Sequence, residues 1–125
     1  MQKALHKQIQ AIEKGLPFKE FNSVRQRLSM TQQSLGQAIG IGHTTLSKRK
    51  KDKRFTMGES ERIHRISRLL ERATDVFEDK NTAKDWMNTP LEYLQGQTPL
   101  QFTSTELGGR EVENLLGRIE RGVPS

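Results

Sequence analysis

The side chains best suited to binding chemistry lie in residues 31–51, TQQSLGQAIGIGHTTLSKRKK, where hydroxyl and amide groups lead into a run of cations. A helix-turn-helix needs a small residue where its two helices cross and a turn that accepts a positive φ. Gly36 and Gly40 stand at these two places. The positions that such a motif buries hold apolar residues, which are Leu35, Ile39, Ile41 and Leu46. The segment therefore predicts a helix-turn-helix.

The second helix of this motif would expose hydroxyl and ammonium groups that can reach base edges in the major groove or donate to phosphates. Gln32, near the start of the first helix, is placed to meet a phosphate with help from the helix dipole. The run KRKKDKR, residues 48–54, carries six cations around one aspartate and would attract the DNA backbone. The predicted DNA contacts are Gln32, Gln33, His43, Thr44, Thr45, Ser47, Lys48, Lys50, Lys51, Lys53 and Arg54.

Two residues depart from the usual pattern of this motif. Gly42 takes the N-cap position, where Ser or Thr is preferred, at a cost of a few tenths of a kcal/mol, roughly. Arg49 stands where the second helix often has another aliphatic core residue. Either the recognition helix is short, or Arg49 lies along the surface with its stem buried.

Metal binding and catalysis find little support in the sequence. His6, His43 and His64 lie far apart and have no carboxylate or His partner at ligand spacing. The chain has no phosphate-binding glycine loop and no nucleophile beside a base. We therefore expect no metal, no cofactor and no enzymatic activity.

The composition indicates a protein with a small apolar core and a basic N-terminal half that suits a polyanion. Of 125 residues, 32% are hydrophobic and 29% are charged, so an oligomer or partner would help to bury apolar surface. Residues 1–60 hold twelve Lys or Arg against four Asp or Glu, whereas residues 61–125 hold nine against eleven. This distribution of charge suits nucleic-acid binding by residues 1–60 and protein contact by residues 61–125. The alternative is that the basic residues form only a solvated surface.

The absence of cysteine suits a reducing cytoplasm, and no apolar run is long enough for a signal peptide or a membrane span.

Helical periodicity dominates, so we expect an all-α fold without a sheet. Thr56 with Glu59, and Thr98 with Gln101, predict two capped helix starts. Residues 78–81 predict a boundary between a helix-turn-helix domain, 1–79, and a small helical domain, 80–125. In the latter, Trp86, Tyr93 and Leu107 are expected in the core, and Gly108-Gly109 as a chain break.

Residues 106–122, ELGGREVENLLGRIERG, read as a short docking helix. Its packing stripe is Val112, Leu115, Leu116 and Ile119. Gly117 is expected on the exposed face, where close approach by another chain would explain a glycine, and Arg118 and Arg121 could form forked hydrogen bonds to a partner's acidic groups. The alternative is a plain surface helix with a frayed end. The predicted partner contacts are Arg110, Glu113, Asn114, Gly117, Arg118, Arg121, Gly122, Val123, Pro124 and Ser125.

The chain resembles the Xre-type antitoxins of RES–Xre toxin–antitoxin systems over roughly residues 17–125. The stretches that carry the resemblance are TTLSKRKK, Glu59-Ser60, AKDWMNTP, GQTPLQF and TELGGREVENLLGRIERGV. That family joins an Xre-like helix-turn-helix to a toxin-binding domain, also called ParS or MbcA-like. The resemblance implies a RES-domain, NAD-consuming toxin as partner, blocked through the C-terminal helix and tail, dimerisation through the N-terminal region, and repression of the chain's own operon. Pro124 stands where the family tends to have a larger residue.

The sequence leaves open one structural question and two rival functions. Leu5, Ile9, Ile12 and Leu16 predict a first amphipathic helix that forms either a dimer seam or a contact within the chain. A stand-alone dimeric transcription regulator is the main rival function. An architectural nucleic-acid-binding protein with little sequence preference is the other.

Overall fold

The structure, a computed structural model, describes residues 2–122 of the chain and is built from helices. In order they are α1 (Gln2–Lys14), α2 (Phe18–Arg27), α3 (Gln32–Ala38), α4 (His43–Asp52), α5 (Met57–Phe77), α6 (Lys80–Met87), the 3-10 helix η1 (Glu92–Leu94), α7 (Pro99–Phe102) and α8 (Glu106–Glu120). Within this range there is no strand, only an isolated antiparallel bridge between Pro17 and Arg54. The prediction of an all-α fold is confirmed.

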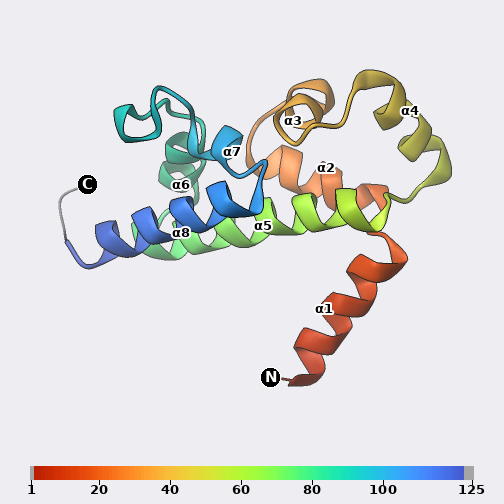
Figure 1. Cartoon of the computed structure of the whole chain (residues 1–125), viewed down its shortest axis with the longest axis horizontal. Coiled ribbons are helices and arrows are strands. Elements are labelled where there is room, and N and C mark those ends of the chain that lie inside the picture. Colours follow the sequence, from red (N-terminus) through yellow and green to blue (C-terminus); the bar gives the residue numbers. More distant parts are fainter. Residues whose placement is uncertain (1, 123–125) are drawn as a thin grey trace.

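The long helix α5 is the element on which the other parts are assembled (Figure 1). α2, α3 and α4 gather over its N-terminal half, whereas α6, α7 and α8 pack toward its C-terminal half. One continuous apolar core joins both halves, with buried side chains from Phe18 in α2 to Leu116 in α8. The predicted helix-turn-helix and the C-terminal helix α8 are therefore both supported by α5.

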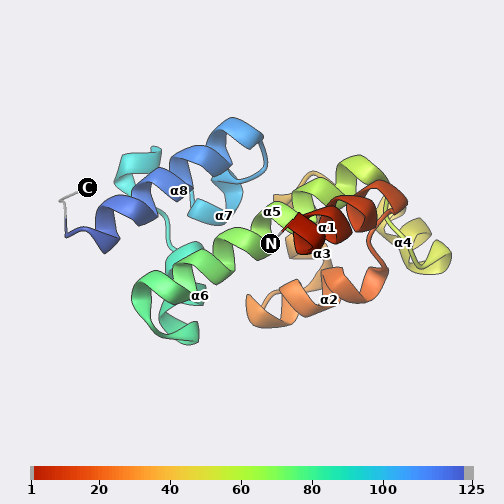
Figure 2. The ribbon, with the colours of Figure 1, turned by 90° about the horizontal axis from the view of Figure 1, so that it is seen from below.

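Helix α1 differs from the rest because none of its residues is buried. It projects from the body near the N-terminal end of α5 in Figure 1 and lies in front of α5 in Figure 2, with Leu5 56% and Ile9 44% exposed. Its end is fixed at Gly15, where φ is 94° and an added Cβ would lie 2.1 Å from the carbonyl oxygen of Phe55. The Leu16 N–H also donates to the Ser60 hydroxyl at 2.8 Å. The helix is thus anchored at one end and carries unpartnered apolar side chains along its length.

Local sequence signals predicted most helix boundaries correctly. Both capping boxes are present, at Thr56 with Glu59 and at Thr98 with Gln101. Gly40 has the predicted positive φ, at 75°, and Gly122 ends α8 with a φ of 72°. Each of these signals acts within a few residues, so it does not depend on the rest of the fold.

In the C-terminal segment, the predicted chain break at Gly108-Gly109 and the predicted burial of Leu107 and Tyr93 are wrong. Gly108 and Gly109 do not break the chain but lie inside the first turns of α8, which Thr105 caps by accepting from the Gly108 N–H. An added Cβ at Gly108 would lie 1.8 Å from the Phe102 carbonyl oxygen, so glycine permits close packing here. Leu107, expected in the core, is 77% exposed because α8 starts one residue before it and turns it outward.

Tyr93 was also predicted to lie in the core, but its side chain is 47% exposed. Its hydroxyl bonds to charged side chains of α8, which keeps the ring at the surface. Trp86 is half-buried and packs against Phe77, with ring centroids 5.7 Å apart. None of the helices in residues 2–122 combines the length and apolar character needed to cross a lipid bilayer.

Candidate DNA interface and C-terminal docking surface

Helices α3 and α4 form the predicted helix-turn-helix around a tight turn. The Ile41 N–H donates to the Gly36 carbonyl at 2.7 Å, and an added Cβ at Gly36 would lie 2.8 Å from the Ile41 carbonyl oxygen. Only a residue without a side chain fits at this crossing. Gly42 is the N-cap of α4, as expected, and makes no side-chain cap. Helix α4 continues to Asp52, so the recognition helix is not short.

A hollow of about 590 Å³ lies between α2, α3 and α4 and carries no carboxylate. It brings together five predicted DNA contacts with three other residues. The predicted ones are Gln32, Gln33, His43, Ser47 and Lys50, and the others are Arg25, Thr31 and Leu46. Its cations are Arg25 and Lys50, and buried Leu46 is its apolar residue. This chemistry suits a nucleic-acid backbone and the base edges beside it.

The remaining predicted DNA residues do not line this hollow. Thr44, Lys48 and Lys51 are exposed along α4, and Thr45 is half-buried. Lys53 follows the helix in a left-handed conformation, with φ 67°. Arg54 donates to the Gly15 carbonyl at 2.7 Å, so its guanidinium holds the link between α1 and α2.

Arg49, for which the sequence allows either a short recognition helix or a stem buried along the surface, turns toward α5. Its Nε donates to Glu59 Oε1 at 2.7 Å and its Nη2 to Oε2 at 3.2 Å. Burial acts to raise the pKa of Glu59, but hydrogen bonds from Arg49 and Thr56 outweigh it, so the pKa lies below its ordinary value. The position thus holds a nearly buried ion pair in place of an aliphatic core residue.

Sequence reasoning missed Arg25, which lies in α2, outside the motif. Its presence at the hollow follows from the packing of α2 on α3, and no local pattern signals it. Gln32, predicted to meet a phosphate, donates its amide N–H to Asn22 Oδ1 at 2.9 Å. One of its donors is thus used within the protein.

The exposed face of α8 contains a second hollow, of about 350 Å³, that crosses onto α5. It is lined by Arg72, Glu113, Asn114, Gly117, Arg118 and Arg121. Gly117 was predicted to be exposed, which is wrong, because it is buried beneath neighbouring side chains. An added Cβ there would meet the Arg121 guanidinium at 3.2 Å. The glycine leaves a recess that the arginines border.

Ion pairs between α5 and α8 hold the walls of this recess. Arg72 bonds to both carboxylate oxygens of Glu120, at 2.9 and 2.8 Å, and the bond lowers the pKa of Glu120. Arg68 pairs with Glu113 at 2.8 Å. Sequence reasoning missed both α5 arginines, since only packing shows which carboxylates of α8 they meet.

Arg118 is held by Tyr93, which sequence reasoning had assigned to the core. Its Nη1 donates to the Tyr93 hydroxyl at 2.5 Å, and its guanidinium lies 5.5 Å from the centre of the ring. The hydrogen bond from Arg118 to Tyr93 raises the pKa of the guanidinium. Tyr93 in turn donates to Glu111 at 3.2 Å. The Arg118 side chain is thereby oriented before any partner arrives.

The other predicted contacts lie around the recess or beyond the structure. Arg110 is exposed one turn from Glu106 and bonds to it at 3.0 Å, and Asn114 is exposed beside the recess. Gly122 ends the helix. Val123, Pro124 and Ser125 lie outside the described residues.

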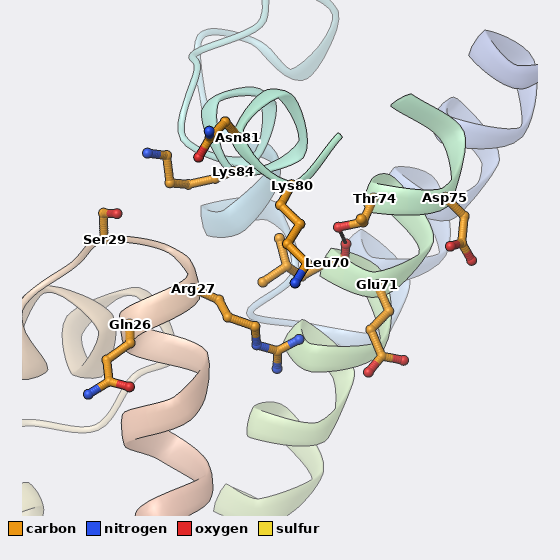
Figure 3. A pocket seen from close by; sticks show the side chains of 10 residues that line it. All are labelled: Gln26, Arg27, Ser29, Leu70, Glu71, Thr74, Asp75, Lys80, Asn81 and Lys84. Atoms are coloured by element: carbon orange, nitrogen blue, oxygen red, sulfur yellow. Dashed lines mark hydrogen bonds between the residues drawn. The ribbon is translucent and has the colours of Figure 1, made fainter. Parts of the chain in front are cut away.

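A third hollow, of about 590 Å³, lies where α2, α5 and α6 meet (Figure 3). Its lining mixes Arg27, Lys80 and Lys84 with Glu71 and Asp75, so it has no strong preference for one sign of charge. Residues 2–122 contain no cluster of three or more His, Asp or Glu side chains that could hold a metal ion.

Comparison with known proteins assigns both halves of the chain. Residues 7–68 match the family model of the antitoxin Xre-like helix-turn-helix domain, and residues 72–122 match that of the antitoxin Xre/MbcA/ParS C-terminal toxin-binding domain. The two matches meet within α5, in the middle of the continuous core.

Proteins called antitoxin Xre are similar over most of the chain. The one from Yersinia enterocolitica is 37% identical over 117 residues, which cover 92% of this chain and 79% of that protein. The one from Photorhabdus laumondii is 34% identical over 116 residues, covering 91% and 78%. The one from Pseudomonas putida is 34% identical over 79 residues, covering 63% and 50%. The chain therefore belongs to the Xre-type antitoxin family, with an Xre-like helix-turn-helix domain and a C-terminal toxin-binding domain.

Proposed function

We propose that this antitoxin neutralises a RES-domain, NAD-degrading toxin by covering its active site with α8 and the residues that follow it. The observation that carries the proposal is the recess at Gly117, which Arg72, Arg118 and Arg121 border. A recess of this size admits a side chain of a partner. Within its lining, Arg72 is already paired with Glu120 and Glu113 with Arg68. Arg121, for which residues 2–122 show no ion pair, therefore suits a carboxylate of the partner. The RES class of the toxin rests on the family resemblance of the sequence. The chain itself is not proposed to catalyse a reaction.

We propose further that the helix-turn-helix binds operator DNA in the promoter of the chain's own operon and represses it. Support comes from the hollow between α2, α3 and α4, which has cations and no carboxylate. The same proposal places the protein in the cytoplasm, where bacterial promoters are. Thr44, Lys48 and Lys51, which are exposed along α4, complete the proposed interface.

We propose a homodimer within the toxin–antitoxin complex, formed through α1. Leu5 and Ile9 are 56% and 44% exposed, and they lie on the same helix one turn apart. Burying them against a second copy would remove apolar surface from water. The division into a DNA-binding domain, 1–79, and a toxin-binding domain, 80–125, is retained as a functional one, although the two share a core.

The test is co-expression with the product of the adjacent reading frame. Removing α8 altogether would expose the core, because Val112, Leu115 and Leu116 are buried. Point variants at the recess are therefore preferable. Gly117→Leu fills the recess and Arg121→Glu reverses a bordering charge. Matched controls are Gly58→Leu, at a glycine with nothing within 4 Å, and Lys19→Glu, on exposed α2 surface.

We expect the chain and both controls to capture a RES-domain protein, protect growth and stop NAD consumption, and both recess variants to fail while keeping their melting temperatures. Full capture by Gly117→Leu and Arg121→Glu would contradict docking at the recess. A version that ends at Gly122 tests the tail separately. If it captures the toxin but NAD consumption continues, residues 123–125 supply the block.

The second candidate is a stand-alone dimeric regulator, which the exposed apolar face of α1 and the helix-turn-helix also suit. It predicts that no neighbouring product is captured while promoter binding and reporter repression persist. Capture of the neighbouring product would reject it.

A further inference from the structure

The hollow between α2, α3 and α4 contains one cation that comes from neither helix of the helix-turn-helix. Arg25 lies in α2 and lines the hollow with Gln33, His43 and Lys50. It is half-buried, and its guanidinium has two anchors within the protein. Nε donates to Asn22 Oδ1 at 3.1 Å and Nη1 to the Met30 carbonyl at 3.3 Å.

Asn22 is the centre of this arrangement. Its Oδ1 accepts from Gln32 Nε2 at 2.9 Å as well as from Arg25 Nε. An amide oxygen has two acceptor sites, so these bonds use both and set the orientation of the amide. One side chain of α2 thereby fixes the positions of a guanidinium and of the first residue of α3.

A guanidinium has five N–H donors. The two anchoring bonds use Nε–H and one hydrogen of Nη1, and the hydrogen bonds found in residues 2–122 include none from Nη2. The Nη2 end is therefore available to an acceptor outside the protein. Since no carboxylate lines the hollow, an anion meets no repulsion there.

We propose that Arg25 contacts a backbone phosphate of bound DNA and that Asn22 is its positioning residue. A phosphate is the preferred acceptor because the two anchors hold the side chain against α2 and the Met30 carbonyl, outside the recognition helix. In helix-turn-helix complexes the recognition helix reads the bases while the elements outside it meet the sugar-phosphate backbone. The inference rests on the DNA binding proposed above and adds a residue outside the motif.

The experiment compares Arg25→Gln with Arg27→Gln, which removes the same charge from the same helix. Arg27 instead points toward α5 in the hollow of Figure 3 and donates to the Ser67 hydroxyl at 2.9 Å. Fluorescence anisotropy would measure affinity over a range of salt concentrations. The probes are the promoter duplex upstream of the chain's reading frame and a random-sequence duplex of equal length. Melting temperatures show whether each variant is folded, and Arg25→Lys provides a second variant at the site.

We expect Arg25→Gln to weaken binding to both duplexes about tenfold at 0.1 M salt and to reduce the slope of log K against log salt by about 0.9. Arg27→Gln should change affinity by less than about twofold. Arg25→Lys should keep most of the salt dependence, because lysine keeps the positive charge. It should still lose affinity, because an ammonium group lacks the planar, forked set of N–H donors of a guanidinium. Asn22→Ala should weaken binding by a smaller factor than Arg25→Gln. Because Asn22 holds both Arg25 and Gln32, the double variant should lose more affinity than Arg25→Gln alone but less than the two single losses combined.

Equal losses of DNA affinity in Arg25→Gln and Arg27→Gln would overturn the proposed phosphate contact, because net charge alone would then explain both losses. A loss confined to the promoter duplex would overturn it in favour of a base contact. Independent, additive losses in the double variant would overturn the positioning role of Asn22. If the unmodified chain binds neither duplex, DNA binding itself fails, and this result is distinct from a failure of Arg25.

Discussion

Arg49 in the recognition helix and Glu59 in the first turn of α5 form a two-pronged ion pair, with N–O distances of 2.7 and 3.2 Å. Glu59 also completes the capping box of α5 by accepting from the Thr56 N–H at 2.9 Å. The same carboxylate thus starts the helix that carries the toxin-binding half and holds the helix proposed to read DNA. The pair ties the two functional elements together at one point.

Replacing Glu59 by Gln should lower the free energy of unfolding by about 1–3 kcal/mol, because the charged hydrogen bonds to Arg49 are lost in a nearly buried place. The Gln oxygen can still accept from Thr56, so the cap survives. Urea denaturation at neutral pH measures the effect. Asp52→Asn is the control, since Asp52 lies 3.9 Å from Arg49 on exposed surface and should cost less than about 0.5 kcal/mol. Equal costs for both variants would contradict the role of the pair.

The contribution of Glu59 should also depend on pH. Its pKa in the folded chain lies below 4.5, because hydrogen bonds from Arg49 and Thr56 outweigh the opposing effect of burial. A lowered folded pKa means that this stability is fully present above 4.5 and is lost as the pH falls through the folded value. We therefore expect the difference in unfolding free energy between the chain and Glu59→Gln to shrink below that pH. A difference that stays constant into acid would refute the assignment.

Gly108→Ala should destabilise the fold by about 2 kcal/mol or more, because the new Cβ would lie 1.8 Å from the backbone carbonyl of Phe102. Gly58→Ala, also inside a helix but in open space, should instead stabilise by up to about 1 kcal/mol. Thermal unfolding of the two variants compares close packing with helix propensity. A neutral Gly108→Ala would show that α7 and α8 can separate freely.

Leu5→Asp with Ile9→Asp should convert the proposed dimer to a monomer without lowering the stability of the chain, since both side chains are exposed within it. Sedimentation equilibrium over a range of concentrations would report the oligomeric state. Gln8→Asp, on exposed surface of the same helix, controls for added charge. A dimer that survives the double substitution would place the interface elsewhere.

Leu107 and Leu116 should behave in opposite ways when each is changed to Ala. Leu116 of α8 is fully buried in the core, so its loss should cost about 2–5 kcal/mol. Leu107 is 77% exposed, and its loss should change stability by less than about 0.5 kcal/mol. Urea denaturation measures both. A large cost at Leu107 would mean that it is covered in solution, for example by a second copy.

Signals that act over a few residues predicted the helices well. The capping boxes at Thr56 and Thr98 and the glycine at position 40 depend on hydrogen bonds and backbone sterics within one turn. The helix-turn-helix was predicted because its small and apolar residues recur at fixed spacing. The prediction failed at Gly108 and Gly109 because a pair of glycines has two possible meanings. It can end a helix, or it can allow close packing within one, as it does in α8.

By itself, then, the sequence determined the helical elements, the DNA-reading motif and the family of the chain, because periodicity, caps and ordered motifs are properties of neighbouring residues. Only the tertiary structure decided that Arg49 meets Glu59, that Arg72 meets Glu120 and that Gly117 lies in a recess. These relationships join residues on different helices, and each cation has several carboxylates that it could reach. Packing on the common core selects one carboxylate for each cation. When the apolar stripes of two helices are buried against each other, the polar side chains beside those stripes are brought together.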